Sequence, residues 1–398
     1  MNTKEKLQPF FDVLDTEDVV VFAKRLSAND TGASGAHQAG PYLPNGIAFS
    51  LCPRLQNDGG NPCSEFESSV LSHEVTRNNK LTWYNQGSRN ECRITRWAED
   101  GRKDSVLQKE MTGGLTVILF KLHQGEIAYA WVWFCTNPDE EDLIEERLGP
   151  IEPGSFLFDG HSASVFSGTK KTKPCAQLLE LIPVNWLSKF PDGKELISLT
   201  YSLLAGSSHT ADHRLLTRRS CEYELFLSIE QAHVLPQIKA GFETVDAFIE
   251  MANSVTNRRK SRSGKSFELH LEQIFLEDLL VNTRGGRTEG KKSPDFLFPS
   301  VAHYHDLSWK PENLRMLGVK TTCKDRWRQI LNEADRIPKK HLITLQEGVS
   351  IEQFREMENA GVTLVVPTAL QKKYPEKIRS SLVTLSQFIL ETKSAVGS

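Results

Sequence analysis

Four charged side chains in the second half of the chain have the types and the order that metal-assisted hydrolysis requires. Pro294-Asp295 opens a predicted strand, Lys320 ends a later one, and Glu333 lies on the predicted helix that follows. Carboxylate oxygens hold a hard cation such as Mg²⁺ beside a scissile phosphate, and the cation polarises the phosphoryl oxygen and helps to generate hydroxide. We therefore expect Asp295, with Glu268 or Glu333, to bind magnesium. Lys320 is expected to stabilise developing charge or to orient the attacking water.

The helices that carry the two glutamates are predicted from apolar stripes. In FELHLEQIFLEDLL (267 to 280), Glu268 and Glu272 share a face away from the stripe, so either could supply the carboxylate. Arg326 and Glu333 lie seven residues apart and share a face that could look back toward Lys320. The apolar stripe of that second helix consists of Trp327, Ile330, Leu331, Ala334 and Ile337. Each charged residue alone could be an ordinary surface charge, so the prediction depends on the set and its order.

Composition indicates a soluble protein of two domains. The chain has 398 residues, of which 39% are hydrophobic and 25% charged, and its formal net charge of -3 argues against nonspecific coating of nucleic acid. No apolar run approaches the roughly 20 residues of a membrane-spanning helix, and the beginning of the chain lacks the layout of a signal peptide, so we expect a cytoplasmic protein without a membrane partner. The seven cysteines are scattered without zinc-type spacing and are expected to be reduced.

The periodicity of the chain changes between its two halves. Residues 20 to 135 are mostly strand-like, with a hairpin predicted from GLTVILFKL and IAYAWVWFC. The acidic run PDEEDLIEE (138 to 146) is predicted to begin a helix with a solvated face. Residues 160 to 176 are small, polar and basic, which is typical of a linker. We predict a β-rich domain over 1–165, a linker over 166–180 and a second domain over 181–398.

The second domain alternates predicted strands and helices. PDFLFPS, LRMLGVKT, HLITLQE and GVTLVVP are predicted strands, and DRWRQILNEADRI and SIEQFREMENA are predicted helices, which indicates an α/β domain with a mixed central sheet. The run GGRTEGKK (285 to 292) is close to a phosphate-binding loop, but Lys292 stands where the required hydroxyl should be, so we interpret it as a basic turn. The basic run NRRKSRSGK (257 to 265) could contact DNA phosphates or form a solvated loop.

Long runs at these positions resemble the EcoRII family of Type IIE restriction endonucleases, within the PD-(D/E)XK superfamily. The runs are KRLSANDTGASGAHQAGPYLPNGI (24 to 47), RNECRITRW (89 to 97), ANSVTNRRKSRSGKSFELHLE (252 to 272), KKSPDFLFPS (291 to 300), NLRMLGVKTTCKDRWRQILNEADRI (313 to 337) and LQEGVS (345 to 350). The resemblance implies catalytic roles for Glu268, Asp295, Lys320 and Glu333, with Tyr304 as a further active-site candidate and Mg²⁺ as cofactor. In this family no acid stands two residues before the lysine, where this chain has Gly318.

The resemblance also implies how DNA is recognised. A homodimer would read double-stranded DNA at the palindrome CCWGG through Lys324, Asp325 and Arg326, whose side chains suit guanine and cytosine edges. The alternative is that these charges merely open a helix. A flipped base would lie between Arg219 and Tyr223, although a surface arginine and a buried tyrosine are an equally good interpretation.

The first domain resembles the family's effector domain, a pseudobarrel that binds a second copy of the site. The implied DNA-contacting residues are His37, Tyr42, Arg89, Glu91, Arg93 and Arg96. Cys92 stands where the family has lysine, which predicts the loss of one phosphate contact and a shallower salt dependence. Exposed strand charges are the alternative interpretation of the arginines.

The leading hypothesis is a Type IIE restriction endonuclease that cuts one site when another is bound. A cognate cytosine methyltransferase is expected in the same cell, without being bound to this chain. The alternatives are a sequence-specific DNA-binding regulator with an inactive nuclease fold and a structure-specific repair nuclease. Intact Glu268, Asp295, Lys320 and Glu333 count against the regulator, because an inactive site is expected to lose at least one of them.

Overall fold

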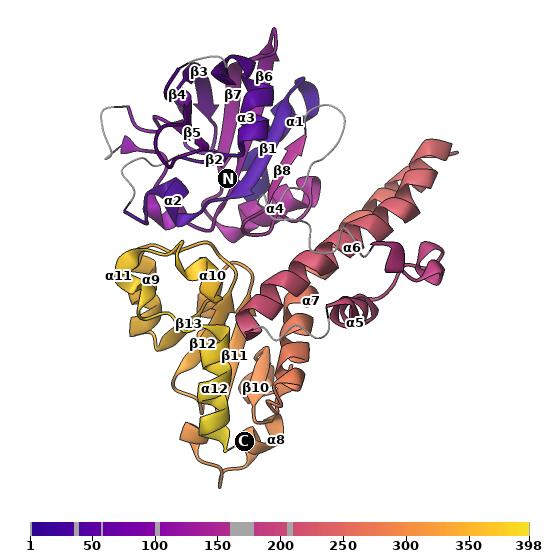
Figure 1. Cartoon of the computed structure of the whole chain (residues 1–398), viewed down its shortest axis with the longest axis vertical. Helices are drawn as coiled ribbons and strands as arrows, with labels where there is room; N and C mark the ends of the chain where they lie inside the picture. Colours follow the sequence, from indigo (N-terminus) through magenta and orange to yellow (C-terminus); the bar gives the residue numbers. More distant parts are fainter. Residues whose placement is uncertain are drawn as a thin grey trace.

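The chain forms two bodies, each with its own sheet (Figure 1). The computed structural model describes residues 2–35, 40–56, 59–99, 104–159, 179–204 and 210–397. Most of the predicted linker, 166–178, lies outside the described residues, and Leu179–Leu181 already forms a short 3-10 turn, η4. Among the described helices, none has the length and apolar content needed to cross a membrane.

The first domain contains an eight-stranded sheet in the order β2-β5-β4-β3-β7-β6-β1-β8. Apolar residues of all eight strands join one core cluster, so the sheet curves around its own interior and forms the predicted pseudobarrel. The opposite face packs on α1 and α4 through a second cluster. The strands are β1 (Val20–Arg25), β2 (Tyr42–Leu43), β3 (Cys63–Val70), β4 (Val75–Tyr84), β5 (Glu91–Thr95), β6 (Leu115–His123), β7 (Glu126–Phe134) and β8 (Phe156–Asp159). The helices are α1 (Thr3–Thr16), α2 (Ala28–Thr31), α3 (Asn45–Leu51) and α4 (Pro138–Leu148), with 3-10 turns η1 (Pro53–Gln56) and η3 (Lys109–Met111).

The predicted hairpin is confirmed as β6 and β7, which pair in antiparallel register. Its connection places Gln124 at φ 53° and Gly125 at φ 79°. Two successive residues with positive φ match the twist of flanking strands, and glycine adopts this conformation without steric cost. The turn therefore closes the predicted hairpin, and a register shift between Lys121 and Leu122 separates it from the rest of the ladder.

The acidic run does form a helix, α4, but the prediction of a solvated face was wrong. Glu140 and Glu141 are buried. The Arg25 guanidinium donates to Glu141 and to Glu145, each at 2.7 Å, and Lys6 bonds Glu140 at 3.1 Å. A buried carboxylate is stable only when it is paired, and these partners lie more than 100 residues away along the chain.

The second domain contains a five-stranded mixed sheet, as predicted. In the order β13-β12-β11-β10-β9, the first three strands are parallel and the last three antiparallel. One apolar cluster covers each face, so the sheet is the middle layer of a sandwich. The strands are β9 (Thr283–Arg284), β10 (Phe296–Phe298), β11 (Arg315–Lys320), β12 (Lys340–Thr344) and β13 (Val362–Val365). The later helices are α8 (Val301–His305), α9 (Ile351–Asn359), α10 (Thr368–Gln371), α11 (Glu376–Arg379) and α12 (Leu385–Val396), and the 3-10 turns are η5 (Val184–Leu187), η6 (Glu289–Lys291), η7 (Pro311–Asn313) and η8 (Arg326–Asn332).

Two long helices form an arm that projects from the second domain (Figure 1). They are α6 (Ala211–Ala240) and α7 (Val245–Glu277), and the shorter α5 (Gly193–Leu203) packs beside both. The basic run 257 to 265 lies inside α7, so it is helical and not the loop considered above. The C-terminal part of α7 buries the predicted stripe of Phe267, Leu271, Ile274 and Phe275 against the sheet.

The prediction of a helix after β11 was wrong, because this segment forms only a 3-10 turn, η8. Glu333 is extended at its C-terminal end, and Ala334 has a left-handed φ of 52°. Pro338 follows closely, and a proline disfavours helical geometry in the residue before it. The apolar stripe is nevertheless buried against one face of the sheet, except for Leu331, which is half-buried. Burial of these residues therefore does not require an α-helix.

Five cysteines are free thiols, as expected, whereas Cys221 is disulfide-bonded, against expectation. The free cysteines are Cys52, Cys63, Cys92, Cys135 and Cys323. Cys92 is buried in the core of the pseudobarrel. The loss of a phosphate contact at Cys92 stays a prediction, and the structure adds that this side chain packs in the core of the domain.

Candidate active site

Asp295 and Lys320 meet at the edge of two paired strands. Asp295 precedes β10, Lys320 ends β11, and the antiparallel register places Phe296 opposite Leu317. The Asp295 carboxylate accepts from the Val319 amide at 2.6 Å and from Lys320 Nζ at 3.3 Å. Both side chains are about one-fifth exposed, at 20% and 22%, so water and substrate can reach them.

Gly318 occupies the position two residues before Lys320. A Cβ atom at Gly318 would lie 2.7 Å from a methyl carbon of Ile330, which belongs to η8. Any side chain here would force that turn away from the strand. The structure therefore explains why no acid stands at Gly318, and η8 leads instead to Glu333.

The negative charge of Asp295 affects the pKa of both Glu268 and Glu333. Burial raises the pKa of Glu268, and the Asp295 carboxylate raises it further. Burial and then Asp295 also raise the pKa of Glu333 to about 7, against opposing effects of Lys320 and Lys340. The carboxyl oxygen Oε2 of Glu333 is buried and has no hydrogen-bond partner within the described part of the chain. These side chains thus form one electrostatically coupled acidic site.

Glu272, the alternative to Glu268, has a different environment. Its carboxylate forms an ion pair with Arg284 at 3.4 Å and is 42% exposed. It is the weakest of the groups that affect the pKa of Glu268. The geometry therefore supports Glu268 over Glu272.

The donor set suits a divalent cation, although the described residues contain no ready-made group of three ligating side chains. The Asp295 charge makes ionisation of Glu268 and of Glu333 more costly, beyond the effect of burial, and one buried oxygen of Glu333 lacks a partner among the described residues. A hard cation would relieve both conditions, since it prefers carboxylate oxygens and cancels their repulsion. Asp295, Glu268 and Glu333 are the residues that would hold it.

A pH dependence follows from the raised pKa of Glu333. Below pH 7 the carboxyl group holds a proton, which a cation must displace on binding. We expect the Mg²⁺ concentration for half-maximal cleavage to fall as pH rises from about 5.5 to 7, and then to level off. Ionisation also removes stability from the metal-free protein as pH rises through 7, because the folded-state pKa lies above its ordinary value. Metal titrations at each pH would test this, and Glu333→Gln should remove the trend; an unchanged trend in that variant would contradict it.

Tyr304, the further catalytic candidate, lies on α8 and is buried. Its hydroxyl donates to Glu289 and accepts from the Arg336 amide at 3.2 Å. Burial raises its pKa well above the usual range, and the Glu289 contact raises it further. The structure places this hydroxyl on the turn that follows Glu333, without a direct contact to Asp295 or Lys320 in the hydrogen bonds described.

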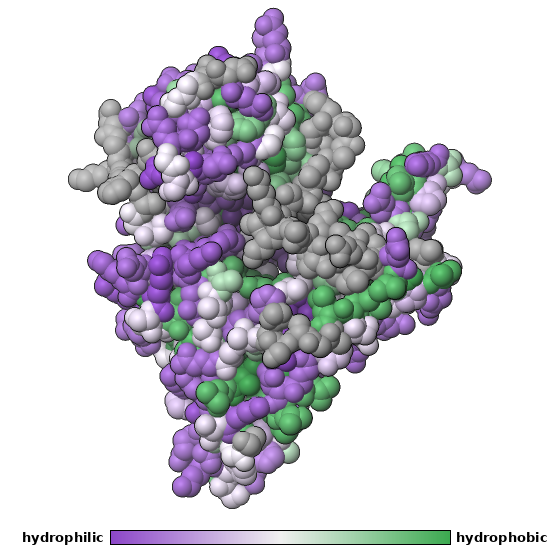
Figure 2. All heavy atoms as spheres, viewed as in Figure 1, coloured by the Kyte–Doolittle hydropathy of each residue, from purple (hydrophilic) through white to green (hydrophobic). Residues whose placement is uncertain are grey.

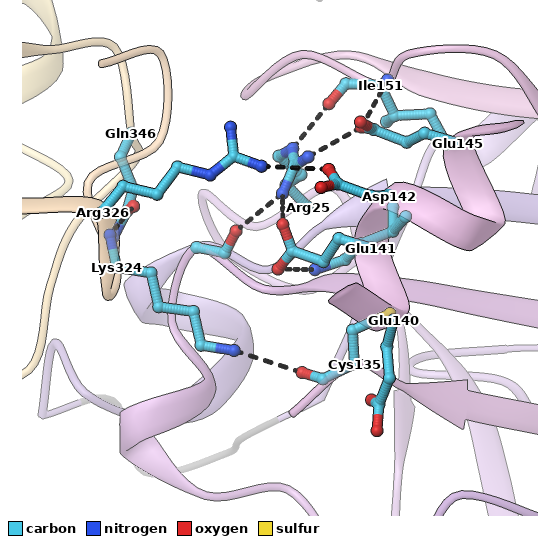
Figure 3. A network of polar contacts seen from close by, with 12 residues as sticks. Arg25, Cys135, Glu140, Glu141, Asp142, Glu145, Ile151, Lys324, Arg326 and Gln346 are labelled. Atoms are coloured by element: carbon cyan, nitrogen blue, oxygen red, sulfur yellow. Dashed lines mark hydrogen bonds and ion pairs between the residues drawn. The ribbon is translucent and has the colours of Figure 1, made fainter. Parts of the chain in front are cut away.

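Two of the three predicted recognition residues, Lys324 and Arg326, contact the first domain (Figure 3). Lys324 Nζ donates to the backbone carbonyls of Cys135 at 3.3 Å and Thr136 at 3.2 Å, and Arg326 pairs with Asp142 of α4 at 3.2 Å. Asp325 pairs with Arg328 at 3.0 Å. Lys324 and Arg326 are therefore held by the first domain in this conformation.

The predicted base-flipping pair is also covered. Arg219 donates to Glu152 of the first domain at 2.8 Å, and its guanidinium lies over Phe267, not over Tyr223. The ring of Tyr223 is instead covered by Arg262 at 4.3 Å. The cavity beside Tyr223 has a volume of about 10 Å³, which holds at most one water. A nucleotide base cannot enter it without rearrangement.

The basic run on α7 is largely neutralised by acidic residues. Arg259 bonds Glu230 on α6, and Lys260 lies 3.6 Å from Glu146 on α4. Arg262 pairs with Glu222 at 2.6 Å and with Glu152 at 3.0 Å. The run is thus an ion-paired helix surface in this conformation, which composition alone did not indicate.

The predicted effector residues occupy different environments. His37 lies outside the described residues. Tyr42 and Glu91 are half-buried, whereas Arg89 and Arg96 are exposed, and Arg96 pairs with Glu65 at 2.9 Å. Arg93 is buried, donates to the Gly40 carbonyl at 2.9 Å and pairs with Asp30 and Glu91. The structure brings Tyr42, Glu91 and Arg93 together on adjoining strands, since Tyr42 pairs with Arg93.

Three residues with clear structural roles near the site were not predicted. Glu152 joins the domains, and Glu289 and Lys340 bind the turn after Glu333. The contacts of these three residues span between 6 and 110 positions along the chain, at no repeated spacing. A lysine directly before the predicted strand HLITLQE was the one available signal for Lys340.

Comparison with known proteins agrees with this architecture. The model described as "Restriction endonuclease EcoRII, N-terminal" matches residues 15–162, and "EcoRII C terminal" matches residues 226–389. The chain is 47% identical to "Type II restriction enzyme EcoRII" of Escherichia coli over 384 residues, covering 94% of both chains. It is 27% identical over 150 residues to "Type II restriction enzyme SsoII" of Shigella sonnei, covering 35% of this chain and 48% of that one.

Two solved DNA complexes are among the structures with partial similarity to this chain. Metal-depleted Ecl18kI with uncleaved, modified DNA has 19% identity and a TM-score of 0.45, covering 57% of this chain and 86% of that chain. The PspGI–substrate DNA complex has 15% identity and a TM-score of 0.43, covering 54% and 98%.

The fold, the acidic site with its lysine and the extended sequence identity define a Type II restriction endonuclease, an enzyme that hydrolyses DNA. Within that class, the chain belongs to the EcoRII family. The inactive regulator and the repair nuclease are accordingly not favoured.

Proposed function

We propose that the chain is a magnesium-dependent endonuclease that cleaves CCWGG sites in double-stranded DNA when a second copy of the site is bound by its first domain. The observation that carries the catalytic part is the contact of Lys320 with Asp295, beside two carboxyl groups whose pKa values are raised. Asp295, Glu268 and Glu333 would hold Mg²⁺. The bound ion would polarise the phosphate and lower the pKa of water.

The chain's own residues then have distinct tasks. The Val319 amide and Lys320 orient the Asp295 carboxylate through its Oδ2 atom. Lys320, a compact point cation, stabilises charge that develops on the phosphate. Lys324, Asp325 and Arg326 read base edges in the major groove. Arg219 and Tyr223 receive a base extruded from the duplex once Arg262 leaves the tyrosine ring.

The contacts between the domains support regulation by a second site. Lys324 and Arg326 bind the first domain through Cys135, Thr136 and Asp142, so they cannot read DNA at the same time. DNA bound to the predicted effector residues would favour a conformation in which the domains separate. These residues are His37, Tyr42, Arg89, Glu91, Arg93 and Arg96. The first domain would thus act as an inhibitor until it binds DNA.

A homodimer is proposed because a palindrome presents two equivalent half-sites. The end of the projecting arm offers an apolar surface for a second copy, as Figure 2 shows. Val245 is 74% exposed, Ile238 53% and Phe248 50%, which is more apolar exposure than scattered surface residues give. Sedimentation velocity should report the mass of a dimer, and the mass of a single chain at micromolar concentration would contradict this part.

The natural setting follows from the reaction. An enzyme that cuts the DNA of its own cell requires protection of the cellular sites, so we propose a cognate cytosine methyltransferase in the same cell, not bound to this chain. We place the enzyme in the cytoplasm, where it meets incoming DNA.

One digestion tests the function directly. A plasmid with two CCWGG sites is incubated with the enzyme in Mg²⁺ and in EDTA, and the ends are mapped by sequencing. We expect cuts at CCWGG in the reaction with Mg²⁺ and no cuts in the reaction with EDTA. Cuts at unrelated sequences would support the repair nuclease, and specific binding without any cut would support the inactive regulator.

A further inference from the structure

The turn that carries Glu333 is held by side chains from elsewhere in the domain. Three consecutive backbone amides of this turn, at residues 334–336, donate to side-chain oxygens. The acceptors are Thr288 Oγ1 at 3.4 Å, Glu289 Oε2 at 3.2 Å and the Tyr304 hydroxyl at 3.2 Å. Thr288 and Glu289 belong to the run GGRTEGKK, for which the proposed reaction gives no use.

The carbonyl side of the same turn is bound by Lys340. This lysine begins β12 and is 5% exposed. Its Nζ atom donates to the carbonyl of Ala334 at 2.7 Å and to the carbonyl of Glu333 itself. A buried ammonium group needs such acceptors, because burial without them is costly.

The turn needs this support because of its backbone conformation. Ala334 has a φ of 52°, a region that disfavours residues with a Cβ atom. Glu289 also accepts from the Tyr304 hydroxyl, so the acceptors around the turn are themselves connected. Removing one member would allow the turn to relax and would move the Glu333 carboxyl group.

We propose that Lys340 and Glu289 are positioning residues for DNA cleavage, which fix the turn that carries Glu333 and so hold its carboxyl group in the acidic site with Asp295. The inference rests on the proposed role of Glu333. Residues that orient metal ligands affect metal affinity or activity by about 10- to 100-fold when they are replaced. A purely structural role would instead lower thermal stability and leave the metal affinity of the folded protein unchanged.

The experiment uses the full chain bound to cognate DNA with an uncleavable linkage at the scissile position. Lys340→Met keeps the aliphatic stem and removes the ammonium group, and Glu289→Gln is the second variant. Lys339→Met is the matched control, since Lys339 is the preceding residue and is exposed. Mn²⁺ affinity is measured from the paramagnetic resonance of the free ion, together with DNA affinity in EDTA and the melting temperature.

We expect Lys340→Met and Glu289→Gln to lower Mn²⁺ affinity by about 10- to 100-fold, with DNA affinity in EDTA within about twofold of the unmodified protein. The control should bind Mn²⁺ normally. In a Glu333→Gln background, Lys340→Met should cause no further loss, because a residue that acts only through Glu333 is not additive with it.

Normal Mn²⁺ affinity in both folded variants would overturn the proposal, as would a full additional loss in the Glu333→Gln background. Failure of both variants to fold at 20 °C would also overturn it, because it would assign the two residues to stability alone. A different result would contradict the proposed function: a Glu333→Gln variant that binds Mn²⁺ and cleaves DNA normally. If Glu333→Gln is defective and Lys340→Met is normal, only the positioning role is lost.

Discussion

Lys320→Ala and Asp295→Ala should each lower the rate of DNA cleavage by about 10²- to 10³-fold or more, while specific DNA binding survives. The size follows from the loss of one group that stabilises charge in the transition state. Asp295 is also one of the three carboxylates that would hold the cation, so its loss should weaken metal binding as well. Single-turnover cleavage in Mg²⁺ and DNA affinity in EDTA are the measurements.

A matched control separates chemistry from loss of charge. Lys310 is an exposed lysine of the same domain outside the site, so Lys310→Ala should cleave at the normal rate. Asp295→Asn keeps the shape of the side chain and tests whether the negative charge itself is required. Normal cutting by Lys320→Ala and Asp295→Ala would refute the mechanism, whereas loss of both cutting and DNA binding would indicate misfolding.

Removal of residues 1–165 should allow efficient cutting of DNA that carries a single site, which the full chain should leave nearly uncut. The deletion removes Cys135, Thr136 and Asp142, which hold Lys324 and Arg326, and Glu152, which holds Arg219. If fewer than one molecule in ten is open in the intact chain, the deletion should increase the apparent affinity for DNA by about tenfold or more. Cleavage of single-site and two-site plasmids is compared for both proteins.

A point variant can test the same contact without deletion. Asp142→Ala removes the partner of Arg326 and should raise single-site cutting in part, whereas Asp139→Ala on the same exposed helix end should not. A deletion variant that folds, binds the site and remains inactive on single-site DNA would show that the first domain does not inhibit.

The local pattern of apolar residues in the sequence was sufficient to predict the architecture of both domains. The strands β10 to β13 follow from short apolar runs, and the hairpin β6–β7 follows from two such runs joined by a short turn. Phe267, Leu271, Ile274 and Phe275 are buried as their spacing predicts. The order of Asp295 and Lys320 along the chain also sufficed to bring them together, because adjacent antiparallel strands place their ends side by side.

Charged segments could not be predicted in the same way. Glu141 and Arg262 lie in runs that composition describes as solvated, yet both are buried against partners far along the chain, Arg25 and Glu152. Nothing local to either run reveals those partners. The conformation of residues 326–337 was mistaken for the same reason, since side chains from residues 288–304 and 340 determine that turn.

The ionic character of the contact between the domains makes salt act on the enzyme in two opposite ways. Screening weakens exposed pairs such as Arg326 with Asp142 and Lys260 with Glu146. The same ions compete with the basic residues for DNA phosphates and weaken binding of the substrate. If the first domain inhibits as proposed, we expect moderate salt to release the closed form and high salt to abolish DNA binding, so the intact enzyme should have an optimum of ionic strength that an isolated catalytic domain lacks.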